Sequence, residues 1–206
     1  MSAASVERST QQTITTNERR QIVAALRAQA LDARSDVSRS DGTLPLHGVV
    51  IETAYEDRVT SLVALADGSV SWYVSDGNGC LGCGNQSDVR REAAILLHAA
   101  EEHLPLCGLA TERLPPPPGN VRCFFLTPDN VLLAEIPLAE VTLIGAPLFS
   151  LYTAGLRVVQ TIERTGAGIA LDREIERAMV ESSSCVRESE AKTCLSVGNV
   201  VRRLRT

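Results

Sequence analysis

The residues whose types and spacing could do chemistry are concentrated in one glycine-rich stretch, DGNGCLGCGN at 76–85. Gly77, Gly79 and Gly82 satisfy the GxGxxG pattern, and the stretch lies between a predicted strand and a predicted helix. A dinucleotide site also needs a parallel βαβ unit and an acidic residue about 20 positions further on. Here the preceding strand belongs to a predicted hairpin, so the sequence disfavours a Rossmann site.

A simpler ligand site at the same place stays open. Backbone amides at the start of a helix can hold an anion or a carboxylate without a Rossmann fold. The candidate ligand-binding residues for such a site all belong to this loop and are Gly77, Asn78, Gly79, Gly82, Gly84 and Asn85.

The same loop carries a C-x-x-C pair, Cys80 and Cys83, just before the predicted helix. The dipole of a helix favours a thiolate at that position, so a redox dithiol is one hypothesis. Zinc is another, but a structural zinc site needs four ligands, and the remaining cysteines are scattered singly. Cys107 and Cys123 are predicted to be small apolar core residues.

Two histidines flank a pair of glutamates in the segment HAAEEH at 98–103. His98 and His103 are five positions apart, which on a helix separates them by roughly 140°, whereas metallopeptidase ligands need a spacing of four. We therefore predict a surface pair of His98 with Glu102, and we predict no catalytic residue and no cofactor for the chain.

The composition of the chain limits its function class. It has 206 residues with a net charge of −5, which fits one domain with tails. The acidic balance and the lack of a basic stripe disfavour nucleic-acid binding. No stretch approaches the ~18 consecutive apolar residues of a membrane span, and residues 1–16 lack the apolar core of a signal peptide. We expect a cytoplasmic protein with reduced thiols.

Apolar periodicity predicts three helices and five strands. The helices are predicted over 17–34, 87–103 and 148–164, and the strands over 48–54, 59–66, 69–75, 121–126 and 131–137.

Turn and cap residues support these boundaries. Asp67-Gly68 predicts a two-residue hairpin turn in which both residues have a positive φ. Asn17 is the predicted cap of the first helix, and Asn85 with Asp88 resembles a capping box for the second. Gly166 is predicted to end the third.

The strand at 69–75 has an apolar face and a polar face. Val70, Trp72 and Val74 are predicted to face the core, whereas Tyr73 shares the other, solvent-facing side with serines.

The order of elements predicts an α+β fold, because strands joined by tight turns form an antiparallel meander. We expect a sheet of about five strands with the helices packed on one face. Residues 17–165 form the predicted domain, with a linker at 35–46 and the core at 46–165. Residues 1–16 are a predicted disordered segment, and 166–206 a charged helix or tail. Similar orders occur in roadblock or longin-like adaptor domains and in type III secretion chaperones, which says nothing about activity.

The stretch DGSVSWYVSDGNG at 67–79, the glycine loop that continues it and VRREAA at 89–94 resemble a family of uncharacterised bacterial proteins. The likeness covers roughly 46–164. It implies no catalytic residues, because no activity is established for that family. Small or aliphatic residues usually replace Cys80 and Cys83 in it, which counts against a redox or zinc role.

These patterns favour a non-enzymatic α+β domain that acts through contacts with itself or another protein, as a homodimer or a subunit of a small assembly. The edges of an antiparallel sheet invite such pairing. One alternative is a small-ligand or anion-binding domain that uses the loop at 76–85. Another is a redox or zinc protein that uses Cys80 and Cys83.

Overall fold

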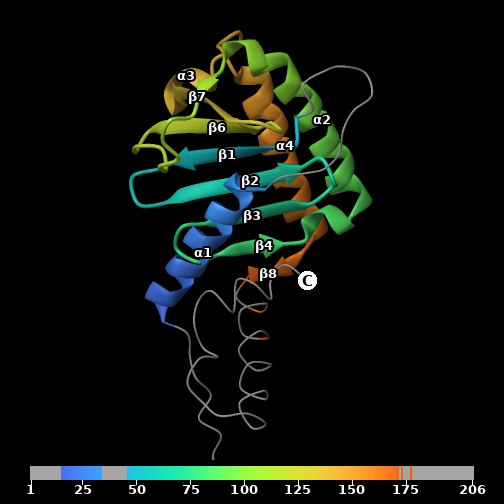
Figure 1. Ribbon diagram of the computed structural model, residues 1–206. Helices are drawn as coiled ribbons and strands as arrows, with labels where there is room; N and C mark the ends of the chain where they lie inside the picture. The colour runs from blue at the N-terminus through green and yellow to red at the C-terminus, as the bar shows by residue number, and fades with distance from the viewer. Residues whose placement is uncertain (1–14, 34–45, 172, 174–176, 178–206) are drawn as a thin grey trace, which may run out of the picture.

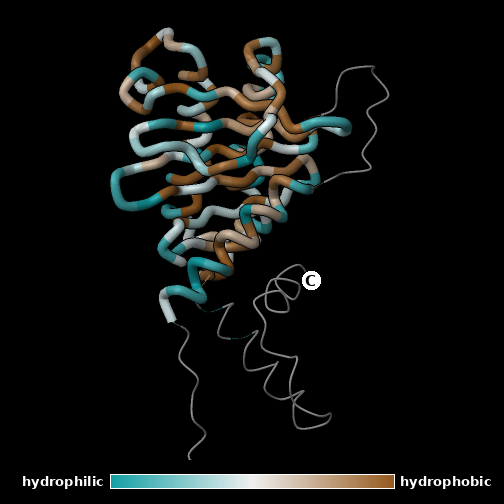
Figure 2. Tube along the Cα trace, turned by 60° about the vertical axis from the view of Figure 1, so that its left-hand side comes forward, coloured by the Kyte–Doolittle hydropathy of each residue, from teal (hydrophilic) through white to brown (hydrophobic). Residues whose placement is uncertain are grey.

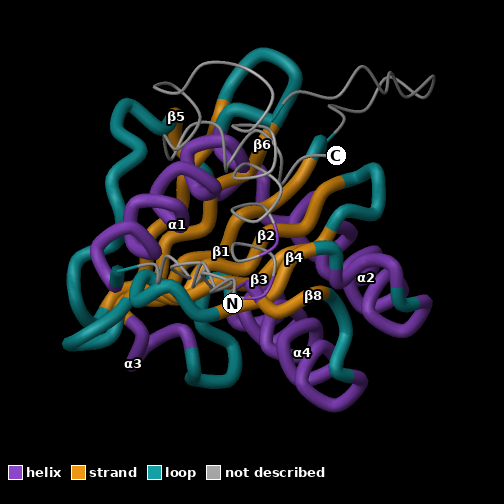
Figure 3. The backbone as a smooth tube through the Cα atoms, turned by 90° about the horizontal axis from the view of Figure 1, so that it is seen from below, coloured by secondary structure: helices purple, strands orange, loops and turns teal. Residues whose placement is uncertain are grey.

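The computed structural model describes residues 15–33, 46–171, 173 and 177. In this part of the chain, one antiparallel sheet separates two helical layers (Figure 1). The strand order is β5-β7-β6-β1-β2-β3-β4-β8. Helix α1 covers one face of the sheet, whereas α2 and α4 lie next to each other on the other face, as the view from below shows (Figure 3).

The strands are β1 (Gly48–Ala54), β2 (Val59–Leu65), β3 (Val70–Val74), β4 (Gly79–Leu81), β5 (Gly108–Leu109), β6 (Asn120–Leu126), β7 (Val131–Pro137) and β8 (Ile169–Ala170). The α-helices are α1 (Thr16–Leu31), α2 (Ser87–His103), α3 (Leu138–Val141) and α4 (Phe149–Thr165). Two short 3-10 turns, η1 (Cys83–Asn85) and η2 (Leu104–Leu106), flank α2.

The predicted α+β class with a single antiparallel sheet is confirmed. The predicted number of about five strands is wrong, because the described residues form eight. The three strands that periodicity missed, β4, β5 and β8, have only three, two and two residues, too few to show an alternating pattern. The helices also pack on both faces of the sheet rather than on one.

The β2–β3 hairpin forms where it was predicted, but its turn differs. Leu65 N–H donates to the Ser69 carbonyl at 2.9 Å, so the loop contains three residues rather than two. Gly68 has a φ of 90°, while Asp67 does not have a positive φ. The Asp67 carboxylate instead accepts the Ser69 N–H at 2.8 Å. A three-residue loop with glycine in its last position is a common hairpin connection.

The helix ends lie within a few residues of the predicted ones, although two predicted caps are wrong. Thr15 rather than Asn17 caps α1, and it forms a capping box with Glu18. Helix α2 spans its predicted range, but its N-cap is Gln86, which makes no side-chain capping bond. Helix α4 ends at Gly166, whose φ of 59° is left-handed, as predicted.

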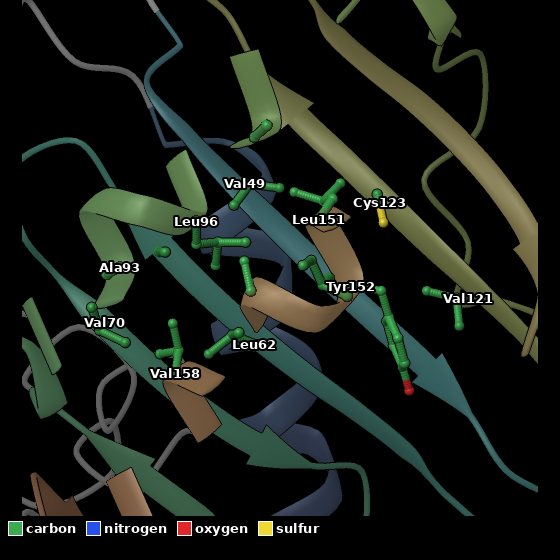
Figure 4. Close-up of a cluster of buried hydrophobic side chains, with 14 of the residues drawn as sticks. Val49, Leu62, Val70, Ala93, Leu96, Val121, Cys123, Leu151, Tyr152 and Val158 are labelled. Atoms are coloured by element: carbon green, nitrogen blue, oxygen red, sulfur yellow. The ribbon is translucent and has the colours of Figure 1, made fainter. Parts of the chain in front are cut away.

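Two hydrophobic clusters lie on opposite sides of the sheet. The larger one lies between the sheet and helices α2 and α4, where Leu62, Leu96 and Leu151 point toward one another (Figure 4). The smaller one lies beneath α1 and includes Tyr73, which is 2% exposed. The predicted solvent-facing side of β3 is therefore covered, because α1 packs on it.

The sheet continues past the predicted domain end at 165. Strand β8 pairs with β4, and Leu171 is fully buried in the cluster beneath α1. Residues 1–14 of the predicted N-terminal segment, most of the predicted linker and nearly all of the predicted tail lie outside the described residues. Within the described part of the chain, the helices are too short or too polar to cross a membrane.

Candidate functional site

The glycine stretch at 76–85 is not one continuous loop. Residues 76–78 form the turn between β3 and β4, and Val74 N–H donates to the Asn78 carbonyl across that turn at 2.8 Å. Strand β4 and the turn η1 follow before α2 begins. The predicted ligand residues Gly77 and Asn78 therefore lie at one end of β4, whereas Gly82, Gly84 and Asn85 lie at the other.

Two of these glycines are required by close backbone packing. A Cβ on Gly79 would lie 2.6 Å from the Cα of Tyr73 on the neighbouring strand. A Cβ on Gly84 would collide with the carbonyl oxygen of Gly68 and would lie 3.2 Å from the Val70 nitrogen. The fold thus accounts for both glycines without a ligand, and the ligand-binding role of the loop stays a prediction.

The two ends of the loop border two different clefts on opposite faces of the sheet. Asp76 and Asn78 border a cleft of about 510 Å³ between α4 and strands β1, β2 and β3, which we call the α4 cleft. Gly82, Gly84 and Asn85 border a second cleft of about 710 Å³ beside α1, which we call the α1 cleft. The predicted site residues are therefore divided between two places.

The α1 cleft lies beside the start of helix α2. Arg90 on the first turns of α2 also borders it and donates from Nε to the Gly84 carbonyl at 3.1 Å. Tyr73 lines the same cleft, and burial raises the pKa of its hydroxyl. Among the described residues, this hydroxyl is the one buried side-chain polar atom that has no hydrogen-bond partner.

The structure brings Cys80 and Cys83 together, and both are buried. A hydrogen bond from the Cys83 thiol lowers the pKa of Cys80, and the same bond raises the pKa of Cys83. Gly168 packs directly against the cysteine pair, because a Cβ added there would lie 2.7 Å from the Cys83 sulfur. Within the described residues, no group of three or more His, Cys, Asp or Glu side chains could hold a metal ion, so the pair has no further zinc ligands there.

The other two described cysteines differ in burial. Cys123 is fully buried in the core, as predicted. Cys107 is only partly buried, and its thiol donates to the His103 carbonyl at 3.3 Å. Burial raises the pKa of Cys107 to about 11, so at neutral pH this side chain is a thiol rather than a thiolate.

The two histidines of the HAAEEH segment have separate surroundings. His98 is on the surface, with Nε2 3.9 Å from Glu102 Oε1, as predicted. His103 has Nδ1 2.7 Å from the Ala99 carbonyl and Nε2 3.3 Å from the Ser150 hydroxyl on α4. His98 lies in a surface pair and His103 joins α2 to α4, so the two histidines do not share a site.

A buried charged cluster beneath α1 was missed in the sequence. Glu52 on β1 is fully buried, and both of its carboxylate oxygens accept hydrogen bonds from Arg27 on α1, at 2.6 and 2.8 Å. The Ser61 hydroxyl donates to the same carboxylate at 3.1 Å. Arg27 also donates to the Arg113 carbonyl at 2.7 Å and lies over the Phe124 ring. The sequence signal that could have found it is the single charged residue, Glu52, in a strand that otherwise has only uncharged residues.

An apolar surface flanks β7 at the β5 edge of the sheet. One part lies around β5, which pairs with β7, and the other follows α3, which contacts β7. Figure 2 shows hydrophobic segments in the loops at this upper end of the molecule. We call it the β7-edge surface, and its members are the exposed side chains Leu106, Leu109, Leu114, Leu143 and Ile144.

The chain was compared with protein families, with curated proteins and with solved structures. None of the three comparisons gave a match. The resemblance over roughly 46–164 therefore stays a prediction.

Proposed function

We propose that this protein is a non-enzymatic interaction domain that self-associates through the β7-edge surface. The observation that carries the proposal is the grouping of exposed apolar side chains. Nine large apolar side chains are exposed among the described residues, and five of them belong to this one surface. A contiguous exposed apolar patch generally marks an interaction site, whereas single exposed apolar residues are ordinary.

The centre of the proposed contact is Ile144, in the segment between α3 and α4. Its side chain is 93% exposed, so it makes almost no contact within its own chain. An isoleucine in that state leaves apolar area in water that a second molecule can cover, which supports burial on association. Leu143 beside it is exposed as well.

The proposed contact uses side chains rather than strand pairing. The edge strands β5 and β8 have two residues each, and short edge strands are a common way of preventing pairing with another sheet. These two strands therefore offer little backbone of their own for pairing with another sheet.

A second copy of the same chain suits this surface. In a two-fold dimer the same patch meets itself, and an uncharged patch does so without bringing like charges together. The side chains that define the β7-edge surface are four leucines and one isoleucine, and the exposed carboxylates nearest them in the chain are those of Glu112 and Glu140.

Light scattering on size-exclusion peaks across a concentration series tests the proposal. The wild type should have a dimer mass, and Ile144→Glu should have the mass of a monomer. The matched control is Ile95→Glu, because Ile95 is an exposed apolar residue on α2 outside the β7-edge surface. This control should stay dimeric. A monomeric wild type at every concentration, or equal behaviour of the two variants, would refute the proposal.

A further inference from the structure

The α4 cleft has a floor built from the β1–β2–β3 meander. Alternate residues of these strands face the same side of a sheet, and the register aligns them across the three strands. The floor has two rows of side chains, with Ile51, Leu62 and Trp72 in the first row, and Thr53, Thr60 and Val74 in the second. The floor is therefore apolar on one side and partly polar on the other.

Helix α4 forms the wall of the cleft. It approaches the sheet closely at Gly155, where a Cβ would lie only 2.9 Å from the Ile51 side chain. Tyr152, Leu156 and Val159 lie on the face of the helix that borders the cleft. The resulting volume of about 510 Å³ is within the usual range for small-ligand pockets.

Three aromatic rings border the cleft, namely Trp72, Tyr55 and Tyr152. Tyr152 shares hydrogen bonds with Thr53 and Tyr55, and burial raises its pKa. These bonds hold the two tyrosine rings next to each other at the cleft. Aromatic faces attract cations, most strongly when the cation is partly removed from water.

The charged groups at the opening favour a cation as well. Asp76 from the β3–β4 turn and Glu163 from α4 both border the cleft. Among the described residues that line the cleft, Arg58 is the one basic side chain; its Nη1 lies 3.5 Å from the Asp57 carboxylate and its guanidinium lies over the Tyr55 ring. The two carboxylates outnumber this cation, so the lining has a net negative charge.

We infer that the α4 cleft binds a small organic cation, namely a protonated or quaternary amine that carries an aromatic or alkyl body. The body packs on the apolar row that contains Trp72, and the cationic group lies among the tyrosines and the two carboxylates. This site is separate from the β7-edge surface, since no residue lines both.

Tryptophan fluorescence tests the inference directly, because Trp72 is the only tryptophan in the chain. Phenylpropylamine, phenylpropanol and phenylpropionate provide a cationic, a neutral and an anionic probe on the same apolar body. The amine should give a saturable change, with an affinity about tenfold above that of the propionate. No saturable change with the amine at millimolar concentration, or equally tight binding of the propionate, would overturn the inference.

A charge variant locates the cation. Glu163→Gln should weaken binding of the amine about two- to fivefold and leave binding of phenylpropanol unchanged, because only the charged probe loses a partner. Glu102→Gln is the matched control, since Glu102 is exposed on α2 and does not line the cleft. The inference fails if the two variants change amine affinity equally.

Discussion

The buried ion pair between Arg27 and Glu52 gives a prediction of large effect. Replacing Arg27 with methionine keeps an unbranched apolar stem on α1 but leaves the Glu52 carboxylate fully buried without its cation. Removing one member of a buried pair destabilises a protein by about 3–5 kcal/mol. The Arg27 side chain is 16% exposed, which admits some water and favours the lower end, about 3 kcal/mol.

The expected loss is measurable by urea unfolding followed by circular dichroism. For a chain of this size, about 3 kcal/mol corresponds to a fall in melting temperature of roughly 6–12 °C. Hydrogen exchange of the α1 amides should rise more than that of the α2 amides, because the pair holds α1 to the sheet.

A double variant separates the stranded charge from the lost packing. Arg27→Met combined with Glu52→Met removes both charges, so it should recover more than half of the stability that the single variant loses. A double variant as unstable as Arg27→Met alone, or a loss below about 1 kcal/mol in the single variant, would refute the reasoning.

Two further predictions concern a surface ion pair and the cover of the cysteine pair. Partial burial raises the pKa of Glu135, but hydrogen bonds from Asn120 and Arg122 outweigh it and leave the pKa below its usual value. The ionised Glu135 carboxylate therefore stabilises the fold above pH 4.5, and this stabilisation is lost as the pH falls through the lowered pKa. Glu135→Gln should reduce the free energy of unfolding by less than about 1 kcal/mol at pH 7, and by less still in acid. A difference that grows on acidification, in urea titrations at several pH values, would contradict this assignment. Gly168→Ala should lower the melting temperature, because the new Cβ would lie 2.7 Å from the Cys83 sulfur at a φ of +84°. An unchanged melting temperature in a thermal scan would mean that Gly168 does not pack on the pair.

The parts of the fold that sequence patterns predicted are those with long local signals. Helix α2 has seventeen residues with an apolar stripe, and its range was predicted without error. The pair Asp67-Gly68 correctly predicted the position of the β2–β3 hairpin. The number of loop residues depends on backbone dihedral angles, which these two residue types do not define. Strands β4 and β8 have too few residues to show an alternating apolar pattern. They form because β4 pairs with β3 and β8 pairs with β4 at the edge of the sheet.

The sites were harder to predict because they depend on contacts distant in sequence. The glycine spacing at 76–85 resembled a ligand-binding motif. In the structure, close packing against Tyr73 and Gly68 explains two of these glycines. The role of Glu52 depends on its ion pair with Arg27, which lies 25 positions away in the sequence and belongs to α1. The floor of the α4 cleft follows from the predicted meander, but its wall required the position of α4.

In the proposed function, the β7-edge surface joins two copies of this chain. Sedimentation equilibrium of the wild type and of Ile144→Glu tests it most directly, because it gives mass without a column or a label. We predict that the wild type approaches twice the chain mass of 22.1 kDa with rising concentration, while Ile144→Glu stays at 22.1 kDa. A wild-type mass of 22.1 kDa over the whole range, or a variant that dimerises as tightly as the wild type, would contradict the claim.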